Sequence, residues 1–183
     1  MTRMFVAVIP PEPTIEDLDE FLSVRRSAGE FRWTLPNQWH VTLAFLESVP
    51  DRTYDELCER LAATAGKHAA YATRIVGGGA FPDPDRARVL FAGLDGSFDD
   101  VSRAARNAAS VSGLAVDGQR FHPHVTLARL GRPANVTKWV RLLDSYSGPS
   151  WTVEELALVE SHLGEGPNRR PRYEVRATFP LHS

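Results

Sequence analysis

The sequence contains one seven-residue segment twice. Residues 40–46 read HVTLAFL and residues 124–130 read HVTLARL, so six of seven positions are identical at a separation of 84 residues. From average residue usage, five consecutive matches are expected in only about one chain in a hundred of this length. Such a repeat is typical of a chain built from two related structural units. It predicts a duplicated fold in which both halves present an equivalent strand.

Each copy has the residue types of a β-strand, since Val, Thr, Leu and Phe favour extended structure. Side chains two residues apart share one face of a strand. His40 and Thr42 therefore share a face, as do His124 and Thr126 in the second copy. The same period puts Phe45 on the face opposite His40, so we expect Phe45 in the core. If the two copies lie together, two imidazoles and two hydroxyls surround one cleft.

Such a cleft suits the cleavage of a phosphodiester bond. A neutral imidazole can take a proton from water, and a protonated imidazole can give one to the leaving oxygen. An ordinary histidine pKa of about 6.5 allows both forms near neutral pH. The threonine hydroxyls can donate hydrogen bonds to phosphate oxygens as negative charge develops. This chemistry requires no metal or other cofactor. A single H-x-T motif would mean little, and the duplication gives the pattern its weight.

The amino-acid composition excludes several classes of protein and of binding site. The 183 residues carry 21 basic and 23 acidic side chains, a balance unlike that of proteins that coat nucleic acid. The single cysteine, Cys58, excludes an internal disulfide and a zinc site built from several cysteines. No apolar run approaches the roughly 20 residues of a membrane span. We therefore expect a cytoplasmic protein without membrane contact, and nothing in the sequence suggests an obligate oligomer.

Hydrophobic periodicity predicts an α+β protein with mostly antiparallel strands, because helices and strands alternate without a regular βαβ period. The triple glycine 77–79 lacks the lysine and spacing of a phosphate-binding loop, so it predicts a turn or a strand bulge. Besides the repeated segments, we expect strands over residues 3–9, 88–92, 151–161 and 173–179, and helices over residues 14–22, 52–67, 97–110 and 135–143.

The paired H-x-T motifs resemble the 2H phosphoesterase superfamily, and within it the bacterial and archaeal RNA 2′,3′-cyclic phosphodiesterases once called 2′-5′ RNA ligases. The resemblance covers almost the whole chain. It implies a single bilobal domain over residues 1–183, with two mostly antiparallel sheets and flanking helices around a central cleft. The matching segments are residues 4–11, 32–33, 39–46, 78–82, 121–129 and 158–161.

The resemblance also implies an activity and roles for individual residues. The activity is hydrolysis of an RNA 2′,3′-cyclic phosphate end to a 2′-phosphomonoester, and some members join tRNA halves through a reversible 2′-5′ bond. His40 would be the proton donor to the leaving oxygen, and His124 the proton acceptor that activates water. Thr42 and Thr126 would bind the phosphate, and Arg129 would add positive charge against it.

The sequence also contains candidate contacts outside the two motifs. Trp33, Phe81 and His122 are candidate nucleotide contacts, although aromatic side chains are more often part of a core. The family usually has an acidic residue two positions before the first histidine, where this chain has Gln38. Arg169, Arg170 and Arg172 form either a basic lip that guides RNA or a solvated loop.

Three other functions remain open at this point. His40, His122 and His124 could together bind zinc in a metal-dependent hydrolase. A related 2H enzyme could act on a small cyclic nucleotide or on ADP-ribose cyclic phosphate. A non-catalytic RNA-binding module would retain basic and aromatic residues but would not require both H-x-T pairs.

Overall fold

The computed structural model describes all 183 residues, and it combines four α-helices with nine strands. The helices are α1 (Glu12–Ser23), α2 (Asp51–Gly66), α3 (Asp99–Val111) and α4 (Thr137–Asp144). The strands are β1 (Thr2–Val8), β2 (Arg32–Trp33), β3 (Val41–Val49), β4 (Tyr71–Phe81), β5 (Ala87–Asp95), β6 (Val125–Ala134), β7 (Trp151–Val153), β8 (Glu155–His162) and β9 (Arg172–Pro180).

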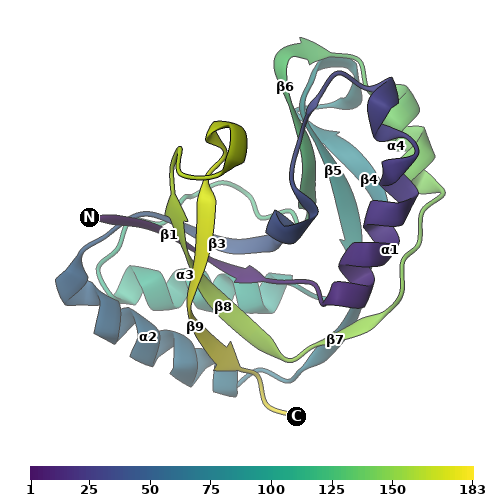
Figure 1. Cartoon of the computed structure of the whole chain (residues 1–183). Helices are drawn as coiled ribbons and strands as arrows, with labels where there is room; N and C mark the ends of the chain where they lie inside the picture. Colours follow the sequence, from purple (N-terminus) through teal and green to yellow (C-terminus); the bar gives the residue numbers. More distant parts are fainter.

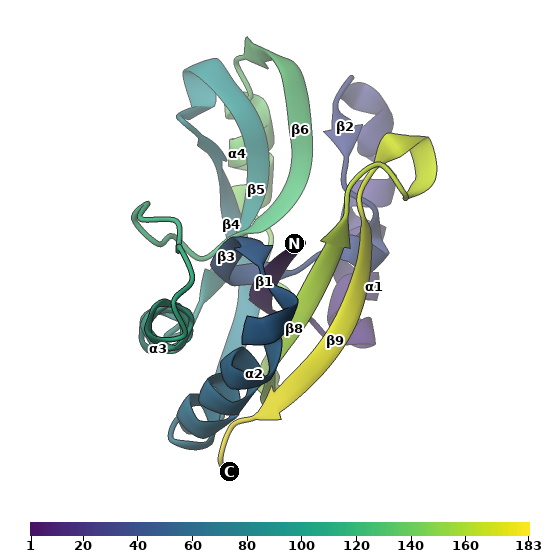
Figure 2. The same cartoon turned by 90° about the vertical axis from the view of Figure 1, so that its left-hand side faces the viewer.

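The strands form one curled antiparallel sheet with a symmetric order. Eight strands follow the order β7-β4-β5-β6-β3-β1-β8-β9, and β2 lies off this path and pairs with Ala128 and Arg129 of β6. The two motif strands, β3 and β6, meet at the centre through a single residue pair, Val41 opposite Val125. We call β3-β1-β8-β9 the first lobe and β6-β5-β4-β7 the second lobe. Figures 1 and 2 show the two lobes curving away from this junction.

The helices cross between the halves of the chain and tie them together. Helix α3 follows a strand of the second lobe but packs on β3 of the first, where the Ser102 hydroxyl donates to the Leu43 carbonyl at 2.7 Å. Helix α1 follows β1 of the first lobe, yet Tyr146, just after α4, packs on Phe21 and donates to Asp17 at 2.6 Å. One core of 36 buried residues runs through both lobes.

The structure confirms the predicted α+β class and all four helices. The strands expected as two sheets join edge to edge at β3 and β6 in one continuous order. The bulge predicted at residues 77–79 is present: the register of β4 shifts between Ile75 and Gly78, and Gly77 has a φ of 68°. The single strand expected over residues 151–161 is wrong, because β7 pairs with β4 while β8 pairs with β1 and β9. None of the helices is long and apolar enough to cross a membrane.

Candidate active site

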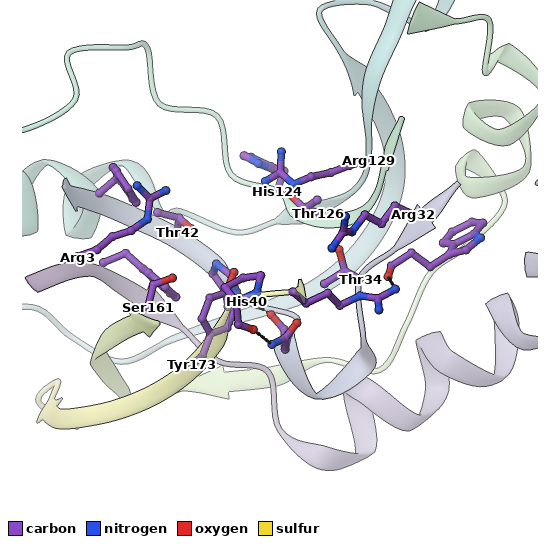
Figure 3. A pocket seen from close by; sticks show the side chains of 16 residues that line it. Arg3, Arg32, Thr34, His40, Thr42, His124, Thr126, Arg129, Ser161 and Tyr173 are labelled. Atoms are coloured by element: carbon purple, nitrogen blue, oxygen red, sulfur yellow. Dashed lines mark hydrogen bonds between the residues drawn. The ribbon is translucent and has the colours of Figure 1, made fainter. Parts of the chain in front are cut away.

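The two copies of the repeat converge on one cleft between the lobes. Its cavity of about 240 Å³ is lined by 16 residues, among them both motif histidines and both motif threonines. Figure 3 shows His40 and His124 on opposite walls, with the threonines beside them. The remaining lining residues are Arg3, Phe5, Arg32, Trp33, Thr34, Gln38, Phe45, Arg129, Ser161, Arg170, Pro171 and Tyr173.

A bulge in β3 interrupts the regular alternation one residue after the first threonine. Thr42 lies opposite Ala7 and Ala44 lies opposite Val6, which leaves Leu43 as an extra residue. Leu43 and Ala44 both join the core, and Phe45 returns to the cleft face. The expectation that Phe45 is a core residue was therefore wrong.

Strand β6 has the equivalent bulge at the equivalent place. Thr126 lies opposite Phe91 and Ala128 lies opposite Leu90, so Leu127 is the extra residue. This bulge brings Arg129 onto the cleft face beside Thr126. The position five residues after each histidine thus faces the cleft in both lobes, but it is Phe45 in one lobe and Arg129 in the other.

Each motif histidine is oriented by the backbone immediately before it. The Nδ1 of His40 lies 2.7 Å from the Gln38 carbonyl oxygen, and the Nδ1 of His124 lies 2.7 Å from the His122 carbonyl oxygen. Because a carbonyl oxygen can only accept, each Nδ1 carries the hydrogen. In the neutral ring, the Nε2 then has a free lone pair. In the protonated ring, the Nε2 becomes a donor. Either ring can serve as acid or base at its Nε2.

Aromatic side chains surround both imidazoles. Phe5 stacks on His40 with ring centroids 4.6 Å apart, and Tyr173 meets the same ring edge-on at 5.4 Å. In the second lobe, Phe81 and Phe91 pack around His124 at 4.9 and 5.4 Å. These contacts fix the ring planes and withdraw the rings from water.

This burial favours the neutral form of each ring. The pKa of His40 is lowered to about 4, mainly by desolvation and also by the nearby His124 and Arg129, while the bond to Gln38 acts in the opposite direction. The pKa of His124 is also lowered, first by burial and then by the charges of His122 and Arg129. Both imidazoles are therefore neutral in the free protein at neutral pH.

The cleft carries a surplus of positive charge. Four arginines line it, and none of its lining residues is acidic. Arg32 and Arg129 are direct cross-strand partners on β2 and β6. Like charges in that position destabilise a sheet. A site of this kind is suited to an anion that neutralises these guanidinium groups.

Only one of the three predicted nucleotide contacts lines the cavity. Trp33 lines the cavity, whereas Phe81 and His122 pack behind His124 and do not line it. Of the predicted basic lip, Arg170 alone lines the cavity. Arg172 is paired with Glu165 and Glu174 instead.

The three-histidine metal site is not assembled. The one group of three metal-ligating side chains whose ligand atoms lie within 4.8 Å of one another is Glu160, His162 and Glu174, on β8 and β9. His40, His122 and His124 form no such group. Each motif Nδ1 is already engaged with a carbonyl oxygen.

Seven lining residues were not given a role from the sequence: Arg3, Phe5, Arg32, Thr34, Ser161, Pro171 and Tyr173. Arg3 and Phe5 are two residues apart on β1, so strand alternation could have placed them on one face. Tyr173 enters through the pairing of β9 with β8, which no local pattern indicates.

Comparison with known proteins gives consistent matches across the chain. A family model described as the 2′-5′ RNA ligase superfamily matches residues 10–165. An RNA 2′,3′-cyclic phosphodiesterase of Aeropyrum pernix is 34% identical over 76% of this chain and 82% of the relative. One of Geobacillus stearothermophilus is 29% identical over 98% of this chain, which spans only 57% of that relative's length. The crystal structure of TT0787 from Thermus thermophilus superposes with a TM-score of 0.81 at 29% identity, covering 99% and 98% of the two chains.

Proposed function

Because the chain belongs to the 2′-5′ RNA ligase superfamily, we propose that it hydrolyses the 2′,3′-cyclic phosphate at the end of an RNA chain to a 2′-phosphomonoester. The relatives named RNA 2′,3′-cyclic phosphodiesterases support this substrate class. The observation that carries the mechanism is the pair of equivalent histidines, each with its Nε2 free, on opposite walls of one arginine-lined cleft.

The reaction is an in-line displacement at phosphorus. The Nε2 of neutral His124 takes a proton from water as the water oxygen bonds to phosphorus. The bond from phosphorus to O3′ breaks, and the Nε2 of protonated His40 gives its proton to that oxygen. The choice of His40 as donor follows the family resemblance. The pKa of His40 is lowered to about 4, so its imidazolium readily protonates an alkoxide leaving group.

The remaining cleft residues stabilise the charge that develops on the phosphate. Thr42 and Thr126 stand beside the two histidines and donate hydrogen bonds to the non-bridging oxygens. Arg129 adds a guanidinium on the same face as Thr126. A 5′-hydroxyl of a second RNA that replaces the water would instead form a 2′-5′ bond. Ligation and hydrolysis then use the same two proton transfers.

The experiment that tests this function is turnover of a short RNA ending in 2′,3′-cyclic phosphate, in the presence of EDTA. We expect the wild type to form the 2′-phosphate isomer, and His40→Ala and His124→Ala each to lower kcat by about 10²-fold or more. Thr42→Val and Thr126→Val each remove one donor and should lower kcat by about 10²- to 10³-fold.

A matched control is His68→Ala. The Nδ1 of His68 also contacts a carbonyl oxygen, that of Thr64 at 2.8 Å, but the residue lies just after α2 and outside the cleft. This variant should keep wild-type activity. Loss of activity in EDTA together with loss in His122→Ala would instead favour a metal-dependent hydrolase. Salt-sensitive RNA binding without any turnover would favour a non-catalytic RNA-binding module.

A further inference from the structure

The loop between β8 and β9 is tied to the opposite side of the cleft. We call residues 163–171 the strap. The Arg32 guanidinium donates to the Asn168 carbonyl at 2.9 Å, and the Arg170 guanidinium donates to the Trp33 carbonyl at 2.9 Å. The strap belongs to the first lobe, whereas β2, which carries Arg32 and Trp33, pairs with β6 of the second lobe. The hydrogen bonds of the two arginines thus connect the lobes at one end of the cleft.

Gln38 provides a third hydrogen bond that holds the strap. Its amide nitrogen donates to the Pro171 carbonyl at 2.6 Å. A carboxylate in this position could not donate, so the amide allows an attachment that an acidic residue would oppose. Within the strap, the Gly166 amide bonds to the Arg170 carbonyl at 2.7 Å. The strap therefore holds Arg170 in a defined place at the cavity wall.

The strap end of the cleft carries more positive charge than the reacting phosphate alone requires. A 2′,3′-cyclic phosphodiester carries one negative charge, and Arg129 lies beside the phosphate-binding Thr126 to meet it. Arg32 and Arg170 each use a single nitrogen on a carbonyl oxygen. Both residues line the cavity, and no lining residue is a carboxylate that could accept from their remaining N–H groups.

The other end of the cleft is less suited to a second anion. Arg3 is the guanidinium there, and it lies over the Phe45 ring at 4.3 Å from its centroid. Figure 3 shows Arg3 and Ser161 at this end and Arg32 and Thr34 at the other, with His40 between them. Only the strap end offers two guanidinium groups held by backbone carbonyls.

We propose that Arg32 and Arg170 bind the phosphate that precedes the terminal nucleotide, so that the cleft selects RNA ends over mononucleoside cyclic phosphates. This inference rests on the proposed function. The RNA chain then leaves the cleft at the strap end, and the like-charge pair of Arg32 and Arg129 is relieved by two successive phosphates of one strand.

The test compares two substrates that differ by one nucleotide, and therefore by the phosphate that precedes the terminal nucleoside. Adenosine 2′,3′-cyclic phosphate lacks the preceding phosphate, and the dinucleotide ApA ending in 2′,3′-cyclic phosphate has it. We expect kcat/KM of the wild type to favour the dinucleotide by about tenfold or more, as expected for charged hydrogen bonds. Arg32→Gln and Arg170→Gln should remove most of that preference, because each should lower kcat/KM for the dinucleotide more than kcat/KM for the mononucleotide. Arg170→Lys should retain part of it, since lysine keeps the charge but loses the planar fork.

Arg172→Gln is the matched control, because Arg172 borders the strap but pairs with Glu165 and Glu174 outside the cavity. It should keep the wild-type preference. Salt provides a second readout. KM for the dinucleotide should rise more steeply with salt than KM for the mononucleotide, and the difference should disappear in the Arg32 and Arg170 variants.

Binding of the two products, adenosine 2′-phosphate and ApA 2′-phosphate, measures the same selectivity without turnover through tryptophan fluorescence, to which Trp33 at the cavity wall contributes. Absence of turnover with selective product binding would refute the proposed function and leave this inference standing. Equal affinity for the two products, or a preference removed by Arg3→Gln and unaffected by the strap variants, would overturn the inference.

Discussion

At the scale of single residues, the site contains two histidines whose protonation depends on what occupies the cleft. Burial against Phe5 and Tyr173, together with the charge of Arg129, lowers the pKa of His40 to about 4. A bound phosphodiester reverses the local field, because its negative charge favours the imidazolium. The substrate itself therefore helps to create the protonated acid that the reaction needs.

This balance predicts different pH profiles for kcat/KM and kcat. The free enzyme must have His40 protonated, with a pKa of about 4, and His124 neutral, with a pKa below 6.5. The profile of kcat/KM should therefore be bell-shaped, with its maximum on the acidic side of pH 6.5, and should fall at higher pH as His40 loses its proton. The kcat profile, which reports the bound state, should lie at higher pH. NMR titration of His40 with and without inorganic phosphate checks the cause. A kcat/KM that is constant from pH 5 to 8 would contradict the pairing.

At the scale of elements, the two-residue period of a strand correctly predicted which motif residues face the cleft, but only up to the threonine of each motif. Thr42 and Thr126 face the cleft as expected, but the bulges at Leu43 and Leu127 reverse the alternation beyond them. The bulges arise in the pairing with β1 and β5, which lie far away in the chain, so the local sequence cannot reveal them. The same reason explains residues 151–161. Their continuous strand pattern is divided because its two parts find different partner strands.

The bulge of β4 makes a prediction about Gly78. A Cβ added there would lie 2.6 Å from Leu143 Cδ1 and 2.7 Å from the Phe91 carbonyl oxygen, where α4 packs on the sheet. Gly78→Ala should therefore lower the free energy of unfolding by about 1–3 kcal/mol through overpacking. Gly66→Ala, in α2, has no atom within 4 Å of the added carbon and should be neutral or stabilising by up to about 1 kcal/mol. Denaturant unfolding of both variants decides this. Equal stability of the two would show that the β4–α4 contact adjusts without cost.

At the scale of the whole molecule, the duplication predicted the meeting of the motifs but not the differences between the lobes. The repeat implied two histidines and two threonines around one cleft, and the central position of β3 and β6 in the sheet brings them there. Arg170 and Tyr173 come from the β8–β9 hairpin, which has no counterpart of matching sequence in the other half. The residues that make the cleft asymmetric could be identified only from the tertiary structure.

The crossed packing of the helices predicts that the two lobes unfold together as a single domain. The buried core is continuous, and α3 of one half is bonded to β3 of the other. Urea unfolding followed by tryptophan fluorescence and by far-ultraviolet circular dichroism should therefore give one coincident transition. Leu43→Ala and Leu127→Ala form a matched pair, since each removes the fully buried bulge residue of one lobe. Each should lower the free energy of unfolding by about 2–5 kcal/mol and move both signals equally. A variant that separates the signals into two transitions would mean that each lobe has an independent core.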